Sequence, residues 1–195
     1  FIESSPAKKK LGYIEVWQEF SRHFSKLGYT PIRRYPVASR WNATSDFVAA
    51  SIYDFQPYVV SGEVEPPANP LVVPQFCLRF NDIPNVGVTG RHFTNFVMIG
   101  QHSVYDEKKK QGYWKDRCID LDFQLLTKVF NIKPEEISFL EDVWVGPNAF
   151  GYSLEYYVRG LELGNAVFTE FIGTPDAYSV MKEKIIDMGA GLERF

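Results

Sequence analysis

The feature of this sequence that most constrains its fold is a pair of alternating segments separated by a turn-forming stretch. In residues 75–81, Phe76, Leu78 and Phe80 fall on one face of an extended chain and polar or small residues fall on the other. Residues 82–90 carry Asn, Asp, Pro and two glycines, which is typical of a tight turn, and residues 92–104 return as a second extended segment. The pattern predicts a long antiparallel hairpin.

The rest of the chain predicts helices and further strands around this hairpin. Apolar spacing of three and four residues predicts helices over residues 13–27 and 114–130, the first of them capped by Gly28. A charged hairpin tip is expected at residues 106–112, and a long ordered loop at residues 56–74, which hold five prolines. Further strands are expected at residues 30–37, 47–53, 137–140, 154–158, 166–171 and 185–187, with Gly146, Pro147 and Gly151 interrupting the chain between 140 and 154.

No internal repeat or domain linker is visible, so residues 1–195 are interpreted as one α+β domain built on an antiparallel sheet. Hydrophobic residues at 45% and charged residues at 23% exclude a disordered or fibrous chain. A net charge of −3 gives no overall signature of a nucleic-acid binder, although a local basic cleft is compatible with it. No apolar run approaches the roughly 18 residues of a membrane span. The chain starts with Phe1 instead of Met, and is interpreted as a fragment cut at both ends.

The two cysteines, Cys77 and Cys118, form no Cys-x-x-Cys pair. Neither a zinc knuckle nor a disulfide framework is therefore indicated, and a reducing compartment is expected. His23 and His102 have no metal-like partners in the sequence and are interpreted as structural residues.

Arg79 is the most informative single residue because it stands in an otherwise apolar strand segment. A buried guanidinium without a partner is costly, so an anionic partner is expected. It is either a carboxylate such as Asp82 or Asp187, in a structural ion pair, or the phosphate or carboxylate of a ligand. His92 and Phe96, four residues apart on the returning strand, share a face, and either pack in the core or lie beside a purine and its phosphates.

Residues 186–194 join an Asp at a strand end, two glycines and an Arg. Such a turn lets a ligand lie against the backbone at Gly189 and Gly191, while Arg194 caps a phosphate. Two glycines at this spacing are a weak signal alone, and the combination with the two charged residues is more specific.

Three ordered motifs together carry a resemblance to one family. Residues 75–98 contain an Arg, an Asn-Asp-x-x-Asn-Val-Gly turn and an Arg-His-x-Thr-x-Phe-x-Met strand, and resemble motif 2 of the class II aminoacyl-tRNA synthetases, specifically of the alanine family. Residues 189–194, preceded by Asp187, are similar to motif 3, and residues 50–57 and 66–71 look like the archaeal form. The resemblance spans residues 13–195. It implies a class II fold and a cytoplasmic ligase that activates alanine with ATP and transfers it to the 3′ end of tRNA(Ala).

The resemblance also implies an ATP site. Arg79 and Arg194 would be its catalytic groups and would hold the α-phosphate and the γ-phosphate end. Phe96 would stack on adenine. Asp82 and His92 would support the triphosphate, its Mg²⁺ or the motif 2 loop. Met98 and Gly191 would also belong to the ATP site.

An alanine site is implied in the same way. Asp187 would pair with the α-ammonium, Asn165 would orient the amino acid, Trp144 would form a wall of the side-chain pocket, and Gly189 would belong to the same site. Mg²⁺ is expected mainly through ATP, with no metal ligand assigned in the protein. Zinc is expected only in an editing module outside these residues, as is the tRNA-recognition region. A motif 1-like segment at residues 13–37 is compatible with a homodimer.

Two departures from the family pattern leave alternatives open. Val97 stands where the family usually has Glu, and Gly146-Pro147-Asn148 stand where archaeal relatives show three glycines. Val97 favours a synthetase-like paralogue that binds nucleotide or RNA without charging tRNA. A further alternative is a folded domain whose Arg79 is merely paired in the core.

Overall fold

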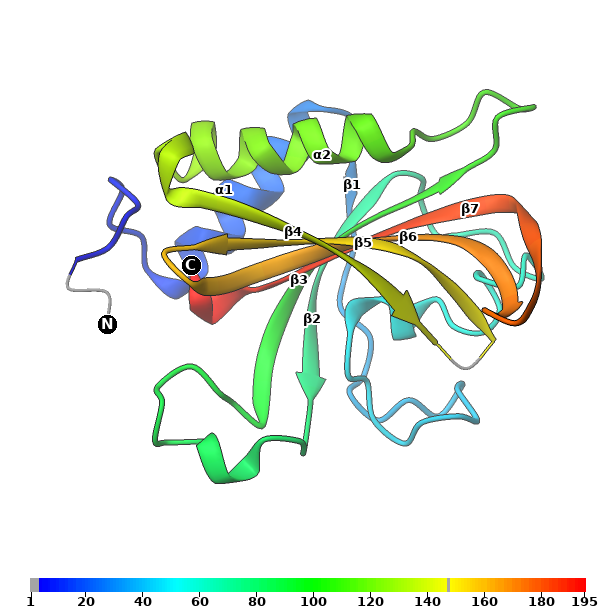
Figure 1. The fold of residues 1–195 in the computed structure, drawn as a ribbon, viewed down its shortest axis with the longest axis horizontal. Coiled ribbons are helices and arrows are strands. Elements are labelled where there is room, and N and C mark those ends of the chain that lie inside the picture. Colours follow the sequence, from blue (N-terminus) through cyan, green and yellow to red (C-terminus); the bar gives the residue numbers. More distant parts are fainter. Residues whose placement is uncertain (1–3, 147) are drawn as a thin grey trace.

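The computed structural model describes residues 4–146 and 148–195 and, within them, a seven-stranded sheet (Figure 1). The strand order is β1-β2-β3-β7-β6-β5-β4. All neighbouring strands are antiparallel except β1 and β2, which are parallel. The predicted α+β fold built on an antiparallel sheet is therefore confirmed, with one parallel pair at its edge. The strands are β1 Thr30–Pro31, β2 Leu71–Leu78, β3 Asn95–Tyr105, β4 Ile137–Val145, β5 Ala149–Val158, β6 Leu161–Thr174 and β7 Ala177–Gly191.

Two helices, α1 (Tyr13–Lys26) and α2 (Lys115–Gln124), lie together against one face of the sheet (Figure 1). Gly28 follows α1 with a φ of 91°, and α2 continues into a π-helical turn, η3 (Leu125–Val129), so both predicted helices are confirmed. The core lies between these helices and the sheet because both present apolar faces there. It includes Phe20 and Phe24 of α1 together with residues of β3, β6 and β7. Short 3₁₀ turns are η1 (Ser51–Asp54), η2 (Ile83–Asn85), η4 (Pro134–Glu136) and η5 (Leu192–Arg194).

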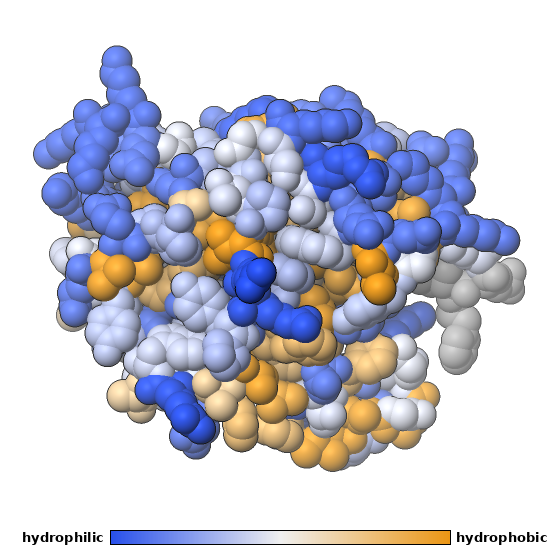
Figure 2. All heavy atoms as spheres, turned by 180° about the vertical axis from the view of Figure 1, so that it is seen from behind, coloured by the Kyte–Doolittle hydropathy of each residue, from blue (hydrophilic) through white to orange (hydrophobic). Residues whose placement is uncertain are grey.

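The predicted hairpin is confirmed as β2 and β3, although both strands are displaced from their expected bounds. Pairing runs from Leu71 opposite His102 to Leu78 opposite Asn95, and the Arg79 N–H still donates to the Thr94 carbonyl, 3.0 Å away. The connecting loop contains η2. Figure 2 shows hydrophobic side chains along the lower edge of the molecule, the side to which this loop extends, and Val88 is 79% exposed there.

Two predictions in the first half of the chain are wrong. Residues 47–53 form no strand: Phe47 makes a single bridge to Ala38, and η1 follows. The expected loop at 56–74 ends early because β2 begins at Leu71. Pro74 is tolerated within β2 because β1 pairs only with Leu71 and Val72, which leaves that edge free beyond them.

The remaining elements agree in type and differ in length. The extended segment expected at 30–37 is a strand only at β1, and the turn at 106–112 is closed by a bridge between Asp106 and Gln111. β4 to β7 extend well beyond the predicted ranges. β4 is an edge strand, and its polar residues face solvent. A prediction based on the apolar residues 137–140 alone therefore gave too short a strand. Gly151 lies inside β5 instead of interrupting it, and Pro147 is outside the described residues.

Candidate active site

The face of the sheet opposite the helices is built by alternate residues of β3 and β7. Met98 lies opposite Gly191, and His102 lies opposite Asp187. Directly opposed residues of an antiparallel pair project from the same face, so these side chains share one face. The alternate residues, such as Val97 and Ile99, project into the core beneath the helices. The strand period therefore separates a helix-covered face from an open face.

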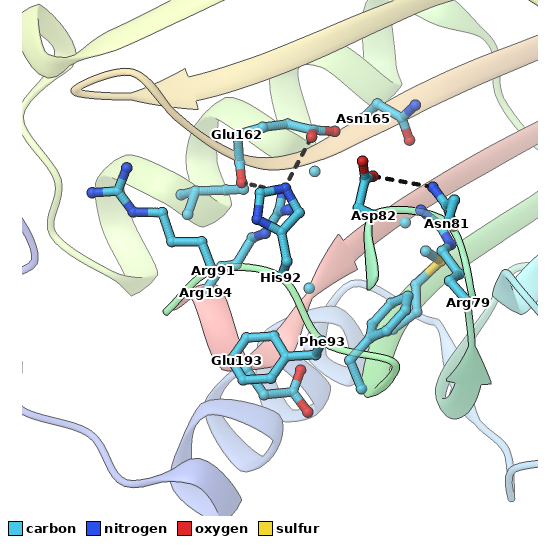
Figure 3. Close-up of a pocket in the computed structure, with 16 residues that line it drawn as sticks. Arg79, Asn81, Asp82, Arg91, His92, Phe93, Glu162, Asn165, Glu193 and Arg194 are labelled. Carbon is cyan, nitrogen blue, oxygen red and sulfur yellow. Dashed lines mark hydrogen bonds and ion pairs between the residues drawn. The ribbon is translucent and has the colours of Figure 1, made fainter. Parts of the chain in front are cut away.

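A first hollow on the open face lies between the β2–β3 loop, β6 and the end of β7. Figure 3 shows Asp82 and His92 of the loop on one side and Glu162 and Asn165 of β6 on the other. The hollow is also lined by Arg91 and Glu193. The sequence predicted no site role for these two residues or for Glu162. The hollow brings together every residue predicted to bind ATP: Arg79, Asp82, His92, Phe96, Met98, Gly191 and Arg194.

Arg79 differs from its prediction as a buried strand residue: it follows the last residue of β2 and is exposed. Its Nε donates to the Ala49 carbonyl, 2.8 Å away, and its guanidinium carbon lies 5.2 Å from the centre of the Phe96 ring. Among the described residues it forms no ion pair with Asp82 or Asp187, so the structural ion-pair alternative is wrong. The guanidinium is thus oriented by a carbonyl and an aromatic ring, at the wall of the hollow.

Arg194 is held in a different way. It belongs to η5, and its Nη1 donates to the carbonyl of Glu162, 2.7 Å away, and lies 3.1 Å from Glu162 Oε2. The neighbouring Glu193 accepts a hydrogen bond from the Val97 N–H through Oε1, at 2.9 Å. Its Oε2 is buried and has no hydrogen-bond partner among the described residues. The wall of the hollow therefore holds Arg79 and Arg194 together with the carboxylates of Glu162 and Glu193, and Arg91 and Asp82 add a third arginine and a third carboxylate.

A second hollow adjoins the first on the same face. It brings together all four residues predicted to bind alanine, and it shares Arg79, Met98, Asn165 and Gly189 with the first hollow. A Cβ at Gly189 would lie 2.6 Å from Met98 Sδ, so this position admits only glycine unless Met98 moves. The four residues are Trp144, Asn165, Asp187 and Gly189.

Asp187 has an unusual environment because its carboxylate is largely buried. Burial raises its pKa to about 7, and Arg79 opposes the shift. His102 Nδ1 lies 3.4 Å from Asp187 Oδ1, and Nε2 lies 3.0 Å from Ser51 Oγ. Burial lowers the pKa of His102 to about 3, so the imidazole is neutral and the contact is not an ion pair. The sequence interpretation missed this contact because strand register, and not local spacing, creates it.

Val97 lies away from both hollows. Its side chain is 3% exposed and packs in the core beneath the helices, whereas Phe96 and Met98 on either side of it line the first hollow. A residue that projects from the opposite face of the strand makes no direct contact with a ligand in the hollows. The departure from the family pattern at Val97 therefore gives no support to a non-charging paralogue.

Among residues 4–146 and 148–195, no three or more His, Cys, Asp or Glu side chains gather as a metal site. Within the same ranges, no helix combines the length and the apolar character that crossing a bilayer requires.

Comparison with known proteins identifies relatives along the whole chain. The family model described as tRNA synthetases class II (A) matches residues 15–195. The chain is 55% identical to an alanine–tRNA ligase of Nitrosopumilus maritimus and 56% identical to one of Cenarchaeum symbiosum, each over 100% of this chain. An alanine–tRNA ligase of Methanocella arvoryzae is 51% identical, again over 100% of the chain. The chain spans 22% of the length of each of these three relatives.

Solved structures show the same fold at low identity. A pyrrolysyl-tRNA synthetase of Desulfitobacterium hafniense aligns with a TM-score of 0.59 at 11% identity, over 95% of this chain and 68% of that one. An aspartyl-tRNA synthetase of Entamoeba histolytica aligns with a TM-score of 0.58 at 12% identity, over 93% of this chain and 53% of that one. At this identity the likeness shows a shared fold and does not extend to substrate.

Proposed function

Because the chain belongs to the class II (A) tRNA synthetases, we propose that it forms the aminoacylation domain of an alanine–tRNA ligase. One observation carries the proposal. The hollow that holds Arg79, Arg194 and the Phe96 ring opens beside the hollow that holds the Asp187 carboxylate, and the two hollows share Arg79. The first has the chemistry that binds a nucleoside triphosphate, and the second has the chemistry that binds a small amine. The relatives named for alanine support the choice of amino acid.

ATP would lie in the first hollow. The adenine would stack on Phe96, and the Arg79 guanidinium, already held against that ring, would bind the α-phosphate. Arg194, anchored by Glu162, would bind the γ-phosphate end. Asp82, His92, Met98 and Gly191 would complete the ATP site. Two cations at opposite ends of one triphosphate would hold it extended and stabilise the charge that develops during transfer.

Alanine would lie in the second hollow. Asp187 would pair with the α-ammonium, Asn165 would orient the amino acid, and Trp144 and Gly189 would bound the space for the methyl group. The alanine carboxylate is already a nucleophile at neutral pH. One of its oxygens forms a bond to the α-phosphorus, and the bond from that phosphorus to the bridging oxygen of the β-phosphate breaks. The products are alanyl-adenylate and pyrophosphate, and no general base is needed.

The second step would transfer the alanyl group to tRNA. A hydroxyl of the 3′-terminal adenosine attacks the alanyl carbonyl carbon, the bond to the phosphate oxygen breaks, and AMP leaves. A pocket of this size distinguishes alanine from glycine by only about 1–3 kcal/mol for one methyl group. Zinc in an editing module and pairing with a second copy through residues 13–37 stay predictions.

The carboxylates that line the first hollow fit a Mg²⁺ ion bound together with ATP. Mg²⁺ takes oxygen ligands and is usually held by substrate phosphates with one or two carboxylates. Glu193, whose buried Oε2 has no partner among the described residues, and Glu162 line the hollow that would hold the phosphates. Bound there, Mg²⁺ would neutralise phosphate charge.

The test is alanine-dependent ATP–pyrophosphate exchange in the full-length protein that carries this sequence. Arg79→Ala removes a donor that acts on developing charge, so we expect kcat to fall by about 10²–10³-fold. Arg33→Ala, an arginine of the segment after β1 that lines neither hollow, is the matched control and is expected to leave the rate unchanged. Exchange that requires an amino acid other than alanine, or that survives Arg79→Ala at the wild-type rate, would overturn the proposal.

A further inference from the structure

His102 is placed against Asp187 by the register of the sheet. The two residues are directly opposed on β3 and β7, and His102 Nδ1 is 3.4 Å from Asp187 Oδ1. The imidazole is 5% exposed, and its plane is fixed by an edge-on contact with the Phe55 ring, 5.1 Å between centres. On the far side of the ring, Nε2 lies 3.0 Å from Ser51 Oγ. His102 therefore bridges a buried hydroxyl and the carboxylate that lines the second hollow.

The order of these three groups resembles a Ser-His-Asp hydrolase triad, but the accessibility is wrong for that chemistry. Ser51 is 0% exposed, so its hydroxyl cannot reach a substrate carbonyl in either hollow. Of the three, only Asp187 lines either of the two hollows described above. The chain of contacts consequently acts on Asp187 instead of activating Ser51.

The contacts also decide which imidazole nitrogen carries hydrogen when Asp187 is ionised. Nδ1 has no hydrogen-bond partner of normal geometry among the described residues, and the acceptors that face the imidazole are Asp187 Oδ1, 3.4 Å from Nδ1, and the backbone of Ile186. A bare lone pair on Nδ1 would repel an ionised carboxylate, whereas an Nδ1–H would donate to it. The Ser51 hydroxyl can donate to Nε2 as well as accept from it, so it accommodates the Nδ1–H tautomer that an ionised Asp187 requires. At 3.4 Å the contact is longer than a normal N–H···O bond, and a bound ammonium that keeps Asp187 ionised would shorten it.

We propose that His102 is a positioning residue that holds one oxygen of Asp187 and leaves the other for the amine of the amino acid. The inference rests on the proposed function, since it assumes that Asp187 binds the α-ammonium. Arg79 is the charged group that acts on Asp187, and both residues line the second hollow. His102 is 5% exposed and contacts Asp187 from within the protein. The carboxylate is thereby oriented before the amino acid arrives, which is the role of supporting residues behind a binding group.

The test replaces each imidazole nitrogen separately in the full-length protein. His102→Asn keeps an N–H donor near the position of Nδ1, and His102→Gln extends beyond it toward the position of Nε2. We expect His102→Gln to raise the KM for alanine in pyrophosphate exchange by about 10- to 100-fold, the range for a hydrogen bond to a charged group. The KM for ATP is expected to change less than about 3-fold, and His102→Asn is expected to stay within about 3-fold of wild type for both substrates.

Two serine variants keep the test decisive if a His102 variant folds poorly. Ser51→Ala removes the hydroxyl that can donate to His102 Nε2 when Nδ1 carries the hydrogen. We expect this variant to raise the KM for alanine by about 3-fold and to leave the KM for ATP unchanged. Ser103→Ala is the matched control, because Ser103 is also buried but donates to Asn69 Oδ1 at 3.1 Å, away from Asp187. It is expected to leave both values unchanged.

The outcomes separate the inference from the function on which it rests. Equal effects of His102→Asn and His102→Gln, or a parallel rise in the KM for ATP, would show that His102 only packs, and would overturn the inference. If Asp187→Asn itself leaves the KM for alanine unchanged, the assignment of Asp187 to the amine is wrong. If Asp187→Asn raises it while no His102 or Ser51 variant does, the function stands and the inference fails.

Discussion

Asp187 on the open face of the sheet and Asp122 on the helix-covered face both have a pKa raised by burial, and the two side chains differ in what they can reach. On the open face, burial raises the pKa of Asp187 to about 7, and the side chain lines a hollow with Arg79. On the helix-covered face, burial raises the pKa of Asp122 of α2 to about 8. Its neighbours there are Cys118, whose Sγ lies 3.6 Å from Asp122 Oδ2, and the fully buried Tyr156. Similar shifts thus arise in a candidate site and in a sealed core.

The comparison of Asp187 with Asp122 shows that burial alone does not identify a functional acid. A strongly shifted pKa marks a candidate only when the group also faces a space where a ligand can bind. Asp187 meets both conditions, whereas Asp122 lines neither of the two hollows, and its Oδ1 is buried without a partner among the described residues. The two acids should therefore respond in opposite ways to removal of their charge.

The largest expected effect is on the open face. Asp187→Asn keeps the shape of the side chain and removes the charge that would pair with the α-ammonium. We expect kcat/KM for alanine to fall by about 10²-fold or more, because a buried charge that loses its partner costs about 2–5 kcal/mol. Pyrophosphate exchange measures this loss, and thermal unfolding in the same buffer should show no loss of stability. A variant that keeps wild-type kcat/KM would remove the functional distinction between the two faces.

The sequence predicted the residues of the open-face site but not the contacts that connect them across strands. The alternation in residues 75–80 and the resemblance of residues 75–98 and 189–194 to two motifs led to Arg79, Phe96, Asp187 and Arg194, which do gather around the two hollows. Those signals are local in the chain. The contact of His102 with Asp187 depends on the register between β3 and β7, which no local pattern encodes.

The same limit explains the errors in the fold. Residues 47–53 are apolar like a strand, yet Ile52 uses that character to pack against Leu71 and Val73 on the face of the sheet. Periodicity shows that a segment is buried, and tertiary packing decides whether it pairs at an edge or lies on a face. Arg79 was expected to be buried because its neighbours are apolar, and the end of β2 one residue earlier exposes it.

An intermediate effect is expected on the helix-covered face, and it concerns stability. The pKa of Asp122 is about 8 in the folded protein and 3.8 for the unperturbed group, so the folded state binds the proton more tightly. The free energy of unfolding must then fall as pH rises from about 4 to about 8, because the unfolded state gains by ionising. Asp122→Asn removes this penalty. We expect it to raise the free energy of unfolding at pH 8, with an upper limit of about 5 kcal/mol set by 1.36 kcal/mol for each of the roughly four units of pKa difference.

Urea unfolding at pH 4.5 and pH 8 measures this change. The gain should be smaller at the lower pH, because pH 4.5 is only just above the pKa of 3.8 for the unfolded chain, which therefore gains little by ionising. Asp116→Asn, which changes an exposed carboxyl in the first turn of the same helix, is the comparison and should show no such gain at pH 8. Alanine-dependent exchange should stay within about 2-fold of wild type for Asp122→Asn. An activity loss as large as that of Asp187→Asn would mean that the helix-covered face also takes part in the reaction.

The smallest expected effect returns to the open face and concerns the Trp144 wall. A Cβ at Gly146 would lie 2.4 Å from Cη2 and 2.8 Å from Cζ3 of the Trp144 indole, so Gly146→Ala forces the ring to move. Because Trp144 bounds the second hollow and not the first, the KM for alanine should rise by about 3- to 10-fold while the KM for ATP stays constant. Gly12→Ala is the control, since its Cβ would meet only Glu15 Oε2, at 3.5 Å. Equal changes in both KM values would mean that the indole supports the whole open face, and would merge the two hollows into one functional unit.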